Sequence, residues 1–417
     1  MAEEEEFKRV QFWYGITMLR TKRFQSIMDH LGSRRITKPV AWVLLFLMPV
    51  GCAFGLYLFL SDLRILLSPT GAVVASYIRT LSPLGNLGLP GINPYLPIVD
   101  GWIALLVGVI VHEGAHGVVA RSLGLRVKSS GMILLLFLPI GFFVDVDEDA
   151  LRKAKARDFQ RVLGAGAGIN LVVGLICLAL LLSLVSTMTP AVNGIAVTSV
   201  YQQSPAATHG IKPGDYITYV DGQPVSNPQT INGSSWYKPG QLINITLWRQ
   251  GEVIQLQNVR LSNITLTNTK TNQTYERAFL GINDASASYV QSLASSYASS
   301  FFKNPFIYMC IPTLPRCQDN VPFSDALSPF YTSPVGNLLP ALANLLYWLF
   351  FLNFNLALFN ALPIYPLDGG QAFLMGVKTL GGKRLSEKGA MAITVLATAA
   401  VAGLILFVVA GPYFFSI

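Results

Sequence analysis

Charged residues are scarce in this sequence, and their scarcity argues against an ordinary soluble fold. Asp, Glu, Lys and Arg make up 12% of the 417 residues, whereas 52% are hydrophobic; a soluble domain carries about 25% charged residues. The basic residues form no patch interleaved with aromatic side chains, so we expect no nucleic-acid partner. The start, MAEEEE, is acidic and the first apolar run begins only near Val40, which argues against a cleaved signal peptide.

The sequence contains long runs of apolar residues. Five of them reach the length of about 20 residues with which a helix crosses a bilayer. A sixth run, at 131–144, is too short to span and fits a re-entrant or strand-like element shielded by protein. We therefore predict a multi-pass α-helical membrane protein with five transmembrane helices, at 40–60, 95–120, 162–185, 338–363 and 389–415.

The orientation of these spans follows from the distribution of the 30 Lys and Arg residues. Residues 1–39 hold 8 of them, 121–161 hold 8 and 376–388 hold 4, which places these three segments in the cytoplasm. Residues 188–337 hold 8 over a much longer stretch, and we expect them outside. That segment contains all four N-glycosylation sequons, at Asn232, Asn244, Asn263 and Asn272. Sequons in a chain without a cleaved signal peptide favour an archaeal cell membrane.

Residues 190–285 have a different composition, in which Asn, Thr, Gln, Gly and Val rise and long apolar runs vanish. Stretches such as GIAVTSV and YITYVDG are typical of short strands. The order GIAVTSVYQQSPAATHGIKPGDYITYVDGQPV resembles a PDZ domain of the type associated with proteases. In that family backbone amides before the first strand bind a peptide C-terminus, which the resemblance places at Gly194, Ile195 and Ala196. A folded plug that limits access by its bulk is the alternative.

The segment 286–337 is rich in Ser, Tyr and Pro and lacks clear periodicity. We predict an extracytoplasmic linker at the membrane interface. Its two cysteines, Cys310 and Cys317, are close in sequence and are expected outside, where a disulfide between them is allowed. Two free thiols are the alternative. Cys52 and Cys177 lie in spans, where we expect them to pack as small apolar side chains.

The stretch GVIVHEGAHGVVAR (108–121) places ionisable side chains inside a predicted span, where a charge costs at least about 2.5–3.5 kcal/mol. His112 and His116 stand at i and i+4 and therefore share a helix face. This is the HExxH arrangement, in which two histidines bind zinc and the glutamate, here Glu113, serves as general base. A metal-free cluster of interhelical hydrogen bonds is the alternative.

A catalytic zinc takes a third protein ligand and leaves its fourth position to water. The best candidate is Asp368, which follows a span in a segment broken by Pro363 and Pro366. Non-helical backbone at membrane depth is tolerated where it lines a protein cavity. The acidic cluster DVDEDA (145–150) competes as a source of ligands, but we interpret it as a solvated turn because close carboxylates need water or hard cations.

The HExxH motif in one span and N-x-x-P-x-x-x-L-D-G in a later one (360–369) resemble the site-2 protease family of intramembrane metalloproteases. GAGIN (166–170) matches the G-x-x-x-N motif of that family, and the inserted domain fits its PDZ-containing branch. The resemblance covers residues 99–370. It implies one zinc ion per chain, held by His112, His116 and Asp368, with Glu113 as base. It also implies that Asn170 and Asn360 hold the substrate backbone or orient helices; ordinary interhelical hydrogen bonding is the alternative.

These features predict an order of segments along the chain. They are a cytoplasmic N-terminal segment (1–39), an extra transmembrane helix with a scaffold or access role (40–60), the first part of the catalytic membrane core (95–187), a PDZ-like domain (190–285), the linker (286–337), the second part of the core (338–375) and a C-terminal transmembrane helix (389–415).

The resemblance implies a zinc-dependent endopeptidase that cuts membrane-spanning protein substrates within the lipid bilayer, after an upstream site-1-type protease has trimmed their outer parts. We expect the 131–144 element or the segment at Pro363–Pro366 to hold the substrate extended. A non-catalytic membrane chaperone or adaptor is the main alternative, but a pure binder has no need of Glu113. A transporter with a metal site would need polar residues through several spans, and 40–60 and 389–415 are almost free of them.

Overall fold

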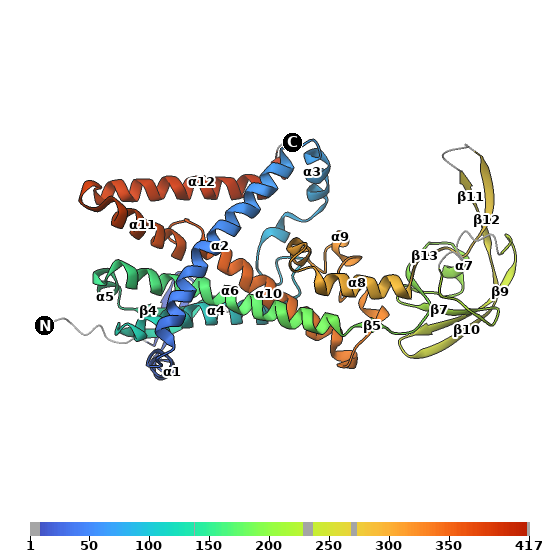
Figure 1. Cartoon of the computed structure of the whole chain (residues 1–417), viewed down its shortest axis with the longest axis horizontal. Helices are drawn as coiled ribbons and strands as arrows, with labels where there is room; N and C mark the ends of the chain where they lie inside the picture. The colour runs from blue at the N-terminus through green and yellow to red at the C-terminus, as the bar shows by residue number, and fades with distance from the viewer. Residues whose placement is uncertain (1–8, 137, 228–236, 268–272, 415–417) are drawn as a thin grey trace. The chain divides into compact units, whose positions relative to one another are not determined.

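The computed structural model describes residues 9–136, 138–227, 237–267 and 273–414 of the chain (Figure 1). The chain divides into two compact units, one made of residues 1–178 and 348–417 and the other of residues 179–347. We call them the membrane unit and the β-rich unit. Helices α6 (Ala156–Ser186) and α10 (Leu339–Ala361) contribute residues to both.

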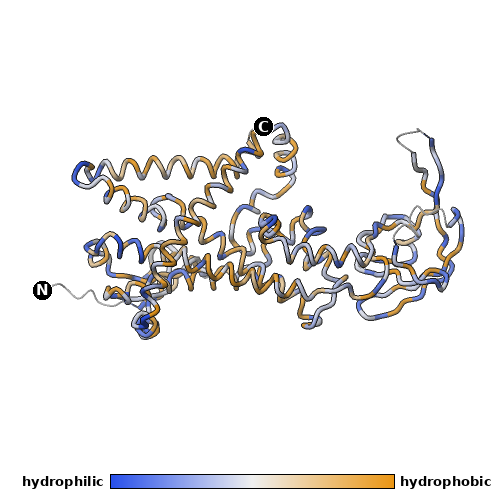
Figure 2. Tube along the Cα trace, in the orientation of Figure 1, coloured by the Kyte–Doolittle hydropathy of each residue, from blue (hydrophilic) through white to orange (hydrophobic). Residues whose placement is uncertain are grey.

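Among the described residues, five helices are long and apolar enough to cross a bilayer, as predicted. Figure 2 shows apolar residues along most of α2 and α12. The five helices are α2 (Thr37–Leu66), α4 (Ile98–Ser122), α6, the stretch Gly336–Ala361 that contains α10, and α12 (Glu387–Phe414). A shorter helix, α1 (Gln25–Gly32), precedes α2. Others lie between the spans: α3 (Gly71–Thr80), η1 (Pro83–Asn86), α5 (Glu148–Lys153), α11 (Asp368–Gly381) and η6 (Gly382–Arg384).

An antiparallel sheet of four strands, in the order β1-β2-β3-β4, belongs to the membrane unit. Strands β3 (Val127–Leu135) and β4 (Leu138–Val146) occupy the predicted 131–144 element, which is therefore strand-like. Strands β1 (Val10–Trp13) and β2 (Ile16–Thr21) form a hairpin around Tyr14 and Gly15, whose positive φ angles suit a two-residue hairpin loop. The sequence patterns did not predict this hairpin, and β2 pairs with β3.

Helix α1 joins this sheet to the helix that carries HExxH. The side-chain amide of Gln25 donates to the carbonyl oxygens of Val127 and Lys128, each at 2.9 Å. Met28, one turn along α1, is buried in a cluster that also holds Val119 of α4. Helix α4 ends where Gly124 takes a φ of +79°, and the chain enters β3 soon after. The sheet therefore lies against α4.

The β-rich unit contains an antiparallel sheet in the order β10-β9-β7-β6-β13, with β8 paired to β7. Apolar side chains from these strands form its buried core, as alternating sequence predicts for half-buried strands. The strands are β6 (Ile195–Val200), β7 (Tyr216–Val220), β8 (Gln223–Pro224), β9 (Leu242–Arg249), β10 (Glu252–Arg260) and β13 (Ile282–Ser286). Beside them lie α7 (Pro205–Thr208), the hairpin of β11 (Ser262–Thr267) and β12 (Thr274–Phe279), and the pair of β5 (Thr189–Pro190) and β14 (Tyr331–Thr332).

This strand order places the residues predicted to bind a peptide C-terminus, Gly194, Ile195 and Ala196, at the start of β6. Strand β6 pairs with β13 on one side and β7 on the other, so Ile195 and Ala196 lie in an internal strand without a free edge. The carbonyl oxygen of Gly194 accepts a hydrogen bond from the N–H of Ala287. The outer strands of this sheet are β10 and β13.

The segment predicted as a linker holds more structure than expected. Helix α8 (Ala287–Ser299) begins at Ser286, whose hydroxyl accepts a hydrogen bond from the N–H of Tyr289 at 3.1 Å. Cys310 and Cys317 form a disulfide, the first of the two alternatives that the sequence left open. The remaining helical turns are η3 (Pro305–Met309), α9 (Pro315–Gln318), η4 (Ser328–Phe330) and η5 (Gly336–Leu338).

Candidate metal centre

Helix α4 presents His112 and His116 to the interior of the membrane unit. The two residues stand one turn apart, so their rings share a face of the helix, and the ring centroids are 4.8 Å apart. Only 8% of His112 and 9% of His116 is exposed. Ring nitrogens buried this deeply need polar partners.

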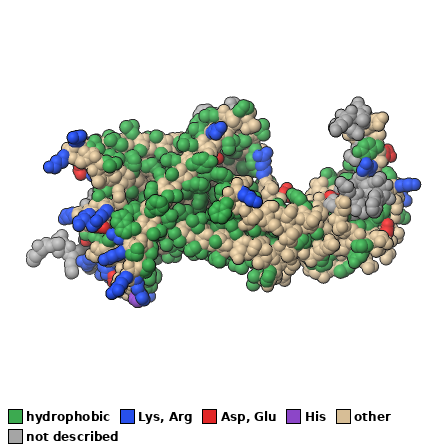
Figure 3. Space-filling view, in the orientation of Figure 1, with side chains coloured by type: hydrophobic (Ala, Val, Ile, Leu, Met, Phe, Trp, Pro, Cys, Tyr) green, Lys and Arg blue, Asp and Glu red, His purple; other side chains and the backbone are tan. Residues whose placement is uncertain are grey.

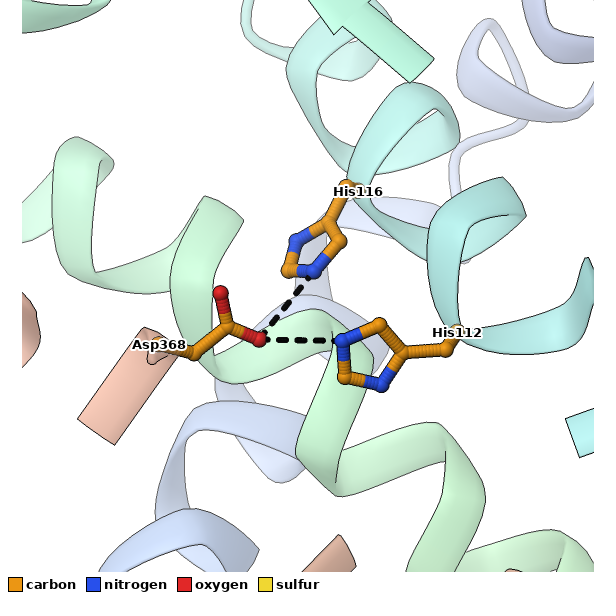
Figure 4. A group of neighbouring side chains, drawn as sticks. All are labelled: His112, His116 and Asp368. Atoms are coloured by element: carbon orange, nitrogen blue, oxygen red, sulfur yellow. Dashed lines mark ion pairs between the residues drawn. The ribbon is translucent and has the colours of Figure 1, made fainter. Parts of the chain in front are cut away.

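Asp368 places its carboxylate against both rings (Figure 4). It is the first residue of α11 and follows the loop that ends α10. Its Oδ2 lies 3.1 Å from Nε2 of His112 and 3.2 Å from Nε2 of His116. The three predicted ligands are thus brought together, with their ligand atoms all within 4.8 Å of one another.

The polar contacts of His116 fit a cation at this point. Its Nδ1 lies 2.7 Å from the carbonyl oxygen of Val162, to which the ring N–H can donate. Its Nε2 then turns a lone pair toward Oδ2 of Asp368, which is buried and lacks a hydrogen-bond partner. Two facing lone pairs repel each other unless a cation lies between them. In a tetrahedral zinc site the ligand atoms are roughly 3.3 Å apart, close to the 3.1 and 3.2 Å found here.

Asn170 of α6 fixes the second ring. It is fully buried, and its amide lies 3.3 Å from Nδ1 of His112. The side-chain oxygen of Asn170 has no other partner. With this oxygen turned toward the ring it accepts the Nδ1–H of His112, which leaves Nε2 free to bind a metal. Asn170 therefore stands where a residue can orient a metal-binding histidine.

Gly166 explains why α6 can approach α4 so closely. A Cβ at this position would lie 2.5 Å from Nε2 of His116 and 2.6 Å from Nε2 of His112, so a side chain would occupy the space of the rings. Gly166 begins the predicted G-x-x-x-N motif, but the sequence did not assign it a role. Gly166 stands four residues before Asn170, so both lie on one helix face. This spacing is the sequence signal from which a role for Gly166 could have been predicted.

Glu113 is turned away from the ligand face of α4 and toward the sheet. Its Oε2 accepts a hydrogen bond from the backbone N–H of Val144 in β4, at 3.1 Å. Strand β4 is an outer strand of its sheet and pairs with β3 on its other side. The predicted base therefore contacts the strand edge that lies against α4.

An apolar cavity of about 750 Å³ lies beside Glu113, within the membrane unit. Its walls come from α1, α2, α4 and strands β2 to β4, and they include Met28, Ile110 and Phe142. Glu113 is the one carboxylate among the described residues that line it. A cavity of this size and lining suits apolar side chains of a ligand.

The other predicted residues have contacts outside the centre. The amide of Asn360 donates to the carbonyl oxygen of Leu356 in its own helix, at 3.1 Å. In the acidic cluster, Asp145 pairs with Arg20 at 3.4 Å and Asp147 caps α5. Of the four sequons, Asn244 and Asn263 are exposed, whereas Asn232 and Asn272 lie outside the described residues.

Comparison with known proteins gives a consistent result. The chain is 24% identical over 360 residues to an uncharacterized protein of Methanocaldococcus jannaschii. The aligned region covers 84% of this chain and 75% of that protein. It is 26% identical over 321 residues to a "putative zinc metalloprotease" of Clostridium perfringens, an alignment that covers 73% of this chain and 90% of that protein. It is 27% identical over 232 residues to zinc metalloprotease RasP of Shouchella clausii, an alignment that covers 54% of this chain and 51% of that protein.

The model of Peptidase family M50 matches residues 101–404, well over half of the chain. The matched region includes the HExxH residues of α4, the G-x-x-x-N motif of α6 and Asp368 of α11. Membership suggests a zinc metalloprotease, and the His-His-Asp group is a suitable site for the metal. The chain belongs to Peptidase family M50, the site-2 protease family whose motifs it carries.

Proposed function

We propose that this protein is a zinc-dependent intramembrane endopeptidase that cleaves the transmembrane segments of membrane-tethered proteins. The observation that supports it most is the convergence of His112, His116 and Asp368 on one buried point, where Oδ2 of the aspartate has no hydrogen-bond donor. Ionisable groups in a span are costly and mark function by default. The family match and the relatives named as zinc metalloproteases support the same activity.

In this proposal His112, His116 and Asp368 hold one zinc ion. When bound, zinc supplies Lewis acidity toward a water molecule and a peptide carbonyl. Glu113 takes a proton from the attacking water and returns it to the departing amine nitrogen. To do so, its carboxylate exchanges the N–H of Val144 for that water.

The substrate has to be locally unwound, because a helix in lipid hides its scissile carbonyl in hydrogen bonds. Strand β4 lies beside Glu113, and no strand among the described residues pairs with its outer edge. We place the unwound substrate along this edge as an added strand. Its apolar side chains then enter the cavity beside Glu113. Helix-breaking residues in the substrate span should accordingly raise the rate of cleavage.

We also propose that the membrane is crossed with the N-terminus inside and the β-rich unit outside. Figure 3 shows Lys and Arg side chains gathered at the end of the membrane unit formed by α1, α5 and the turn from α11 to α12. Such clusters face the cytoplasm in most membrane proteins. The proposed host is an archaeal cell membrane.

The β-rich unit is, in this proposal, a PDZ-like domain that excludes substrates until an upstream protease has shortened their outer part. Peptide would bind at β13 rather than at β6, because β13 is an outer strand of the sheet. Gly281, with a φ of +89°, turns the chain immediately before β13. Binding by strand addition needs an unpaired edge of this kind.

The deciding experiment combines zinc content with cleavage in the detergent-solubilised full-length protein. We expect about one zinc in the wild type and in Glu113→Gln, and no tightly held zinc in His116→Ala. Only the wild type should cut a membrane-anchored test substrate that carries helix-breaking residues in its span. Wild-type protein that takes up no zinc, even on reconstitution, would contradict the proposal and favour the adaptor.

A further inference from the structure

The loop between α10 and α11 is non-helical backbone next to the candidate metal centre. At membrane depth, a backbone polar group of such a loop that finds no partner costs several kcal/mol. Part of the loop is bonded internally: the N–H of Ile364 donates to Leu362 at 2.7 Å, and that of Leu367 donates to Ile364 at 2.8 Å. The N–H of Tyr365 and the carbonyl oxygen of Pro363 are bonded to another helix.

That helix is α12, and the partner of both groups is the hydroxyl of Thr398. Its Oγ1 accepts a hydrogen bond from the N–H of Tyr365 at 3.0 Å and donates one to the carbonyl oxygen of Pro363 at 3.3 Å. A hydroxyl can donate one hydrogen bond and accept others, so one side chain satisfies both backbone groups. Thr394, one turn earlier, is different, because its hydroxyl donates only to Ala390 of its own helix.

The position of this loop determines the position of Asp368. The two residues that follow it pack directly on the loop backbone: a Cβ on Gly369 would lie 2.3 Å from the carbonyl oxygen of Leu362, and one on Gly370 would lie 2.3 Å from the nitrogen of Tyr365. Because the first turn of α11 packs directly on the loop backbone, a shift of the loop moves Asp368 as well. A metal site needs its ligands held within about 0.5 Å.

We propose that Thr398 is a positioning residue for the third metal ligand, acting through the loop that precedes Asp368. This inference rests on the metal site of the proposed function. It gives the C-terminal helix, which carries no ligand, a direct part in the geometry of the centre. Losses of 10–100-fold in metal affinity are typical when a group that orients a ligand is removed.

The test compares three variants of the full-length protein: Thr398→Val, which keeps the shape and removes the hydroxyl, Thr398→Ser, which restores it, and Thr394→Val as the matched control. Zinc affinity is measured by competition with a chelator, and ligand geometry by the visible spectrum of the cobalt(II)-substituted protein. We expect Thr398→Val to bind zinc roughly 10–100-fold more weakly and to change the cobalt spectrum. Thr398→Ser and Thr394→Val should stay within about threefold of the wild type.

Hydrogen exchange of residues 362–370 in the metal-free protein gives a readout that does not depend on zinc. Exchange there should be faster in Thr398→Val than in Thr394→Val. Wild-type affinity and spectrum in Thr398→Val would overturn the inference while leaving the zinc site intact. Absence of zinc from the wild type would instead overturn the proposed function and this inference with it. If Thr398→Val does not fold, Thr398→Ala serves in the same comparisons.

Discussion

Gly166 lies where α6 passes the ligand face of α4, in contact with both histidine rings. Among residue types only glycine leaves the space that the two Nε2 atoms occupy. The carbonyl of Val162 and the amide of Asn170, on the same helix, hold the opposite sides of the rings. Helix α6 therefore sets the orientation of the two histidine rings of α4, the candidate metal ligands.

The first prediction concerns Gly166→Ala. The added methyl group would lie less than 3.0 Å from both rings, a distance that real Cβ atoms essentially never show, so the rings must move. We expect zinc affinity to fall roughly 10–100-fold, measured by chelator competition. Gly403→Ala on α12 is the control, because nothing lies within 4 Å of its Cβ. Equal affinities in the two variants would show that the rings are not confined by α6.

A second residue-scale prediction concerns Asp284 of β13. Burial raises its pKa from 3.8 to about 6, and its Oδ2 has no hydrogen-bond partner. The folded state therefore binds a proton more tightly than the unfolded chain does. The stability that this proton contributes is present below about pH 4 and is lost as the pH rises to about 6.

Asp284→Asn should remove this pH dependence and stabilise the β-rich unit at pH 7 by roughly 1 kcal/mol, a figure reduced for the solvent exposure of the group. The measurement is the hydrogen-exchange protection of β6 and β13 in the full-length protein at pH 4, 5 and 7. Wild-type protection should decline over this range while that of the variant stays level. Parallel curves would rule out Asp284 as the cause.

The grouping of His112, His116 and Asp368 could be predicted from the sequence because their signals are local or depend on composition. His112 and His116 lie four positions apart in an apolar run, and Asp368 follows two prolines after a span. Gly166 and Thr398 could not be assigned in this way, because their roles depend on distances between helices. Nothing in the sequence of α12 distinguishes Thr398, which reaches the loop, from Thr394, which does not.

At the scale of elements, strand β4 and the cavity beside it form the surface that meets Glu113. The cavity is bounded on one side by α4, where Ile110 lines it, and on another by β4 itself. Ile103 lies two turns earlier on the same helix, is 41% exposed and does not line the cavity. The two isoleucines therefore separate effects of the cavity from effects of a larger side chain on α4.

We predict that Ile110→Trp lowers cleavage of a membrane-anchored test substrate at least tenfold without changing zinc content, because the indole fills space that substrate side chains would enter. Ile103→Trp should cleave at the wild-type rate. Cleavage rate and zinc content are measured on the same preparations. Normal cleavage by Ile110→Trp would place the substrate side chains elsewhere.

The spans were predictable at this scale, whereas several smaller elements were not. A transmembrane span can be recognised from its length and hydropathy alone. The β1–β2 hairpin is short, and its pairing with β3 depends on residues far away in the sequence. Helix α8 is rich in serine, and its hydroxyls bond back to carbonyl groups of the helix, as that of Ser295 does to Gln291. Such residues favour caps and turns in sequence statistics.

At the scale of the whole molecule, the division into two units predicts that damage to one leaves the chemistry of the other intact. The disulfide between Cys310 and Cys317 belongs to the β-rich unit, and the candidate metal ligands belong to the membrane unit. Closing so short a loop contributes about 2–3 kcal/mol in the chain-entropy estimate. The stabilisation should therefore be local.

We predict that replacing both cysteines by serine increases hydrogen exchange around α9 and η3 but leaves zinc content at the wild-type value. Reduction of the wild-type protein should have the same effect. The serine variant, which cannot re-form the bond, is the control for incomplete reduction. Loss of zinc on removal of the disulfide would show that the units are energetically coupled.

The pairing of β2 with β3 has a consequence for biosynthesis. The ribosome delivers the N-terminal hairpin first, then the spans α2 and α4, and only afterwards the strand that β2 needs. Until then the hairpin has an unpaired edge, which in other proteins invites wrong association. The sheet can close only after α4, with its two histidines, has been synthesised. Completion of the sheet is thus a late step, which follows synthesis of the helix that carries the candidate metal ligands.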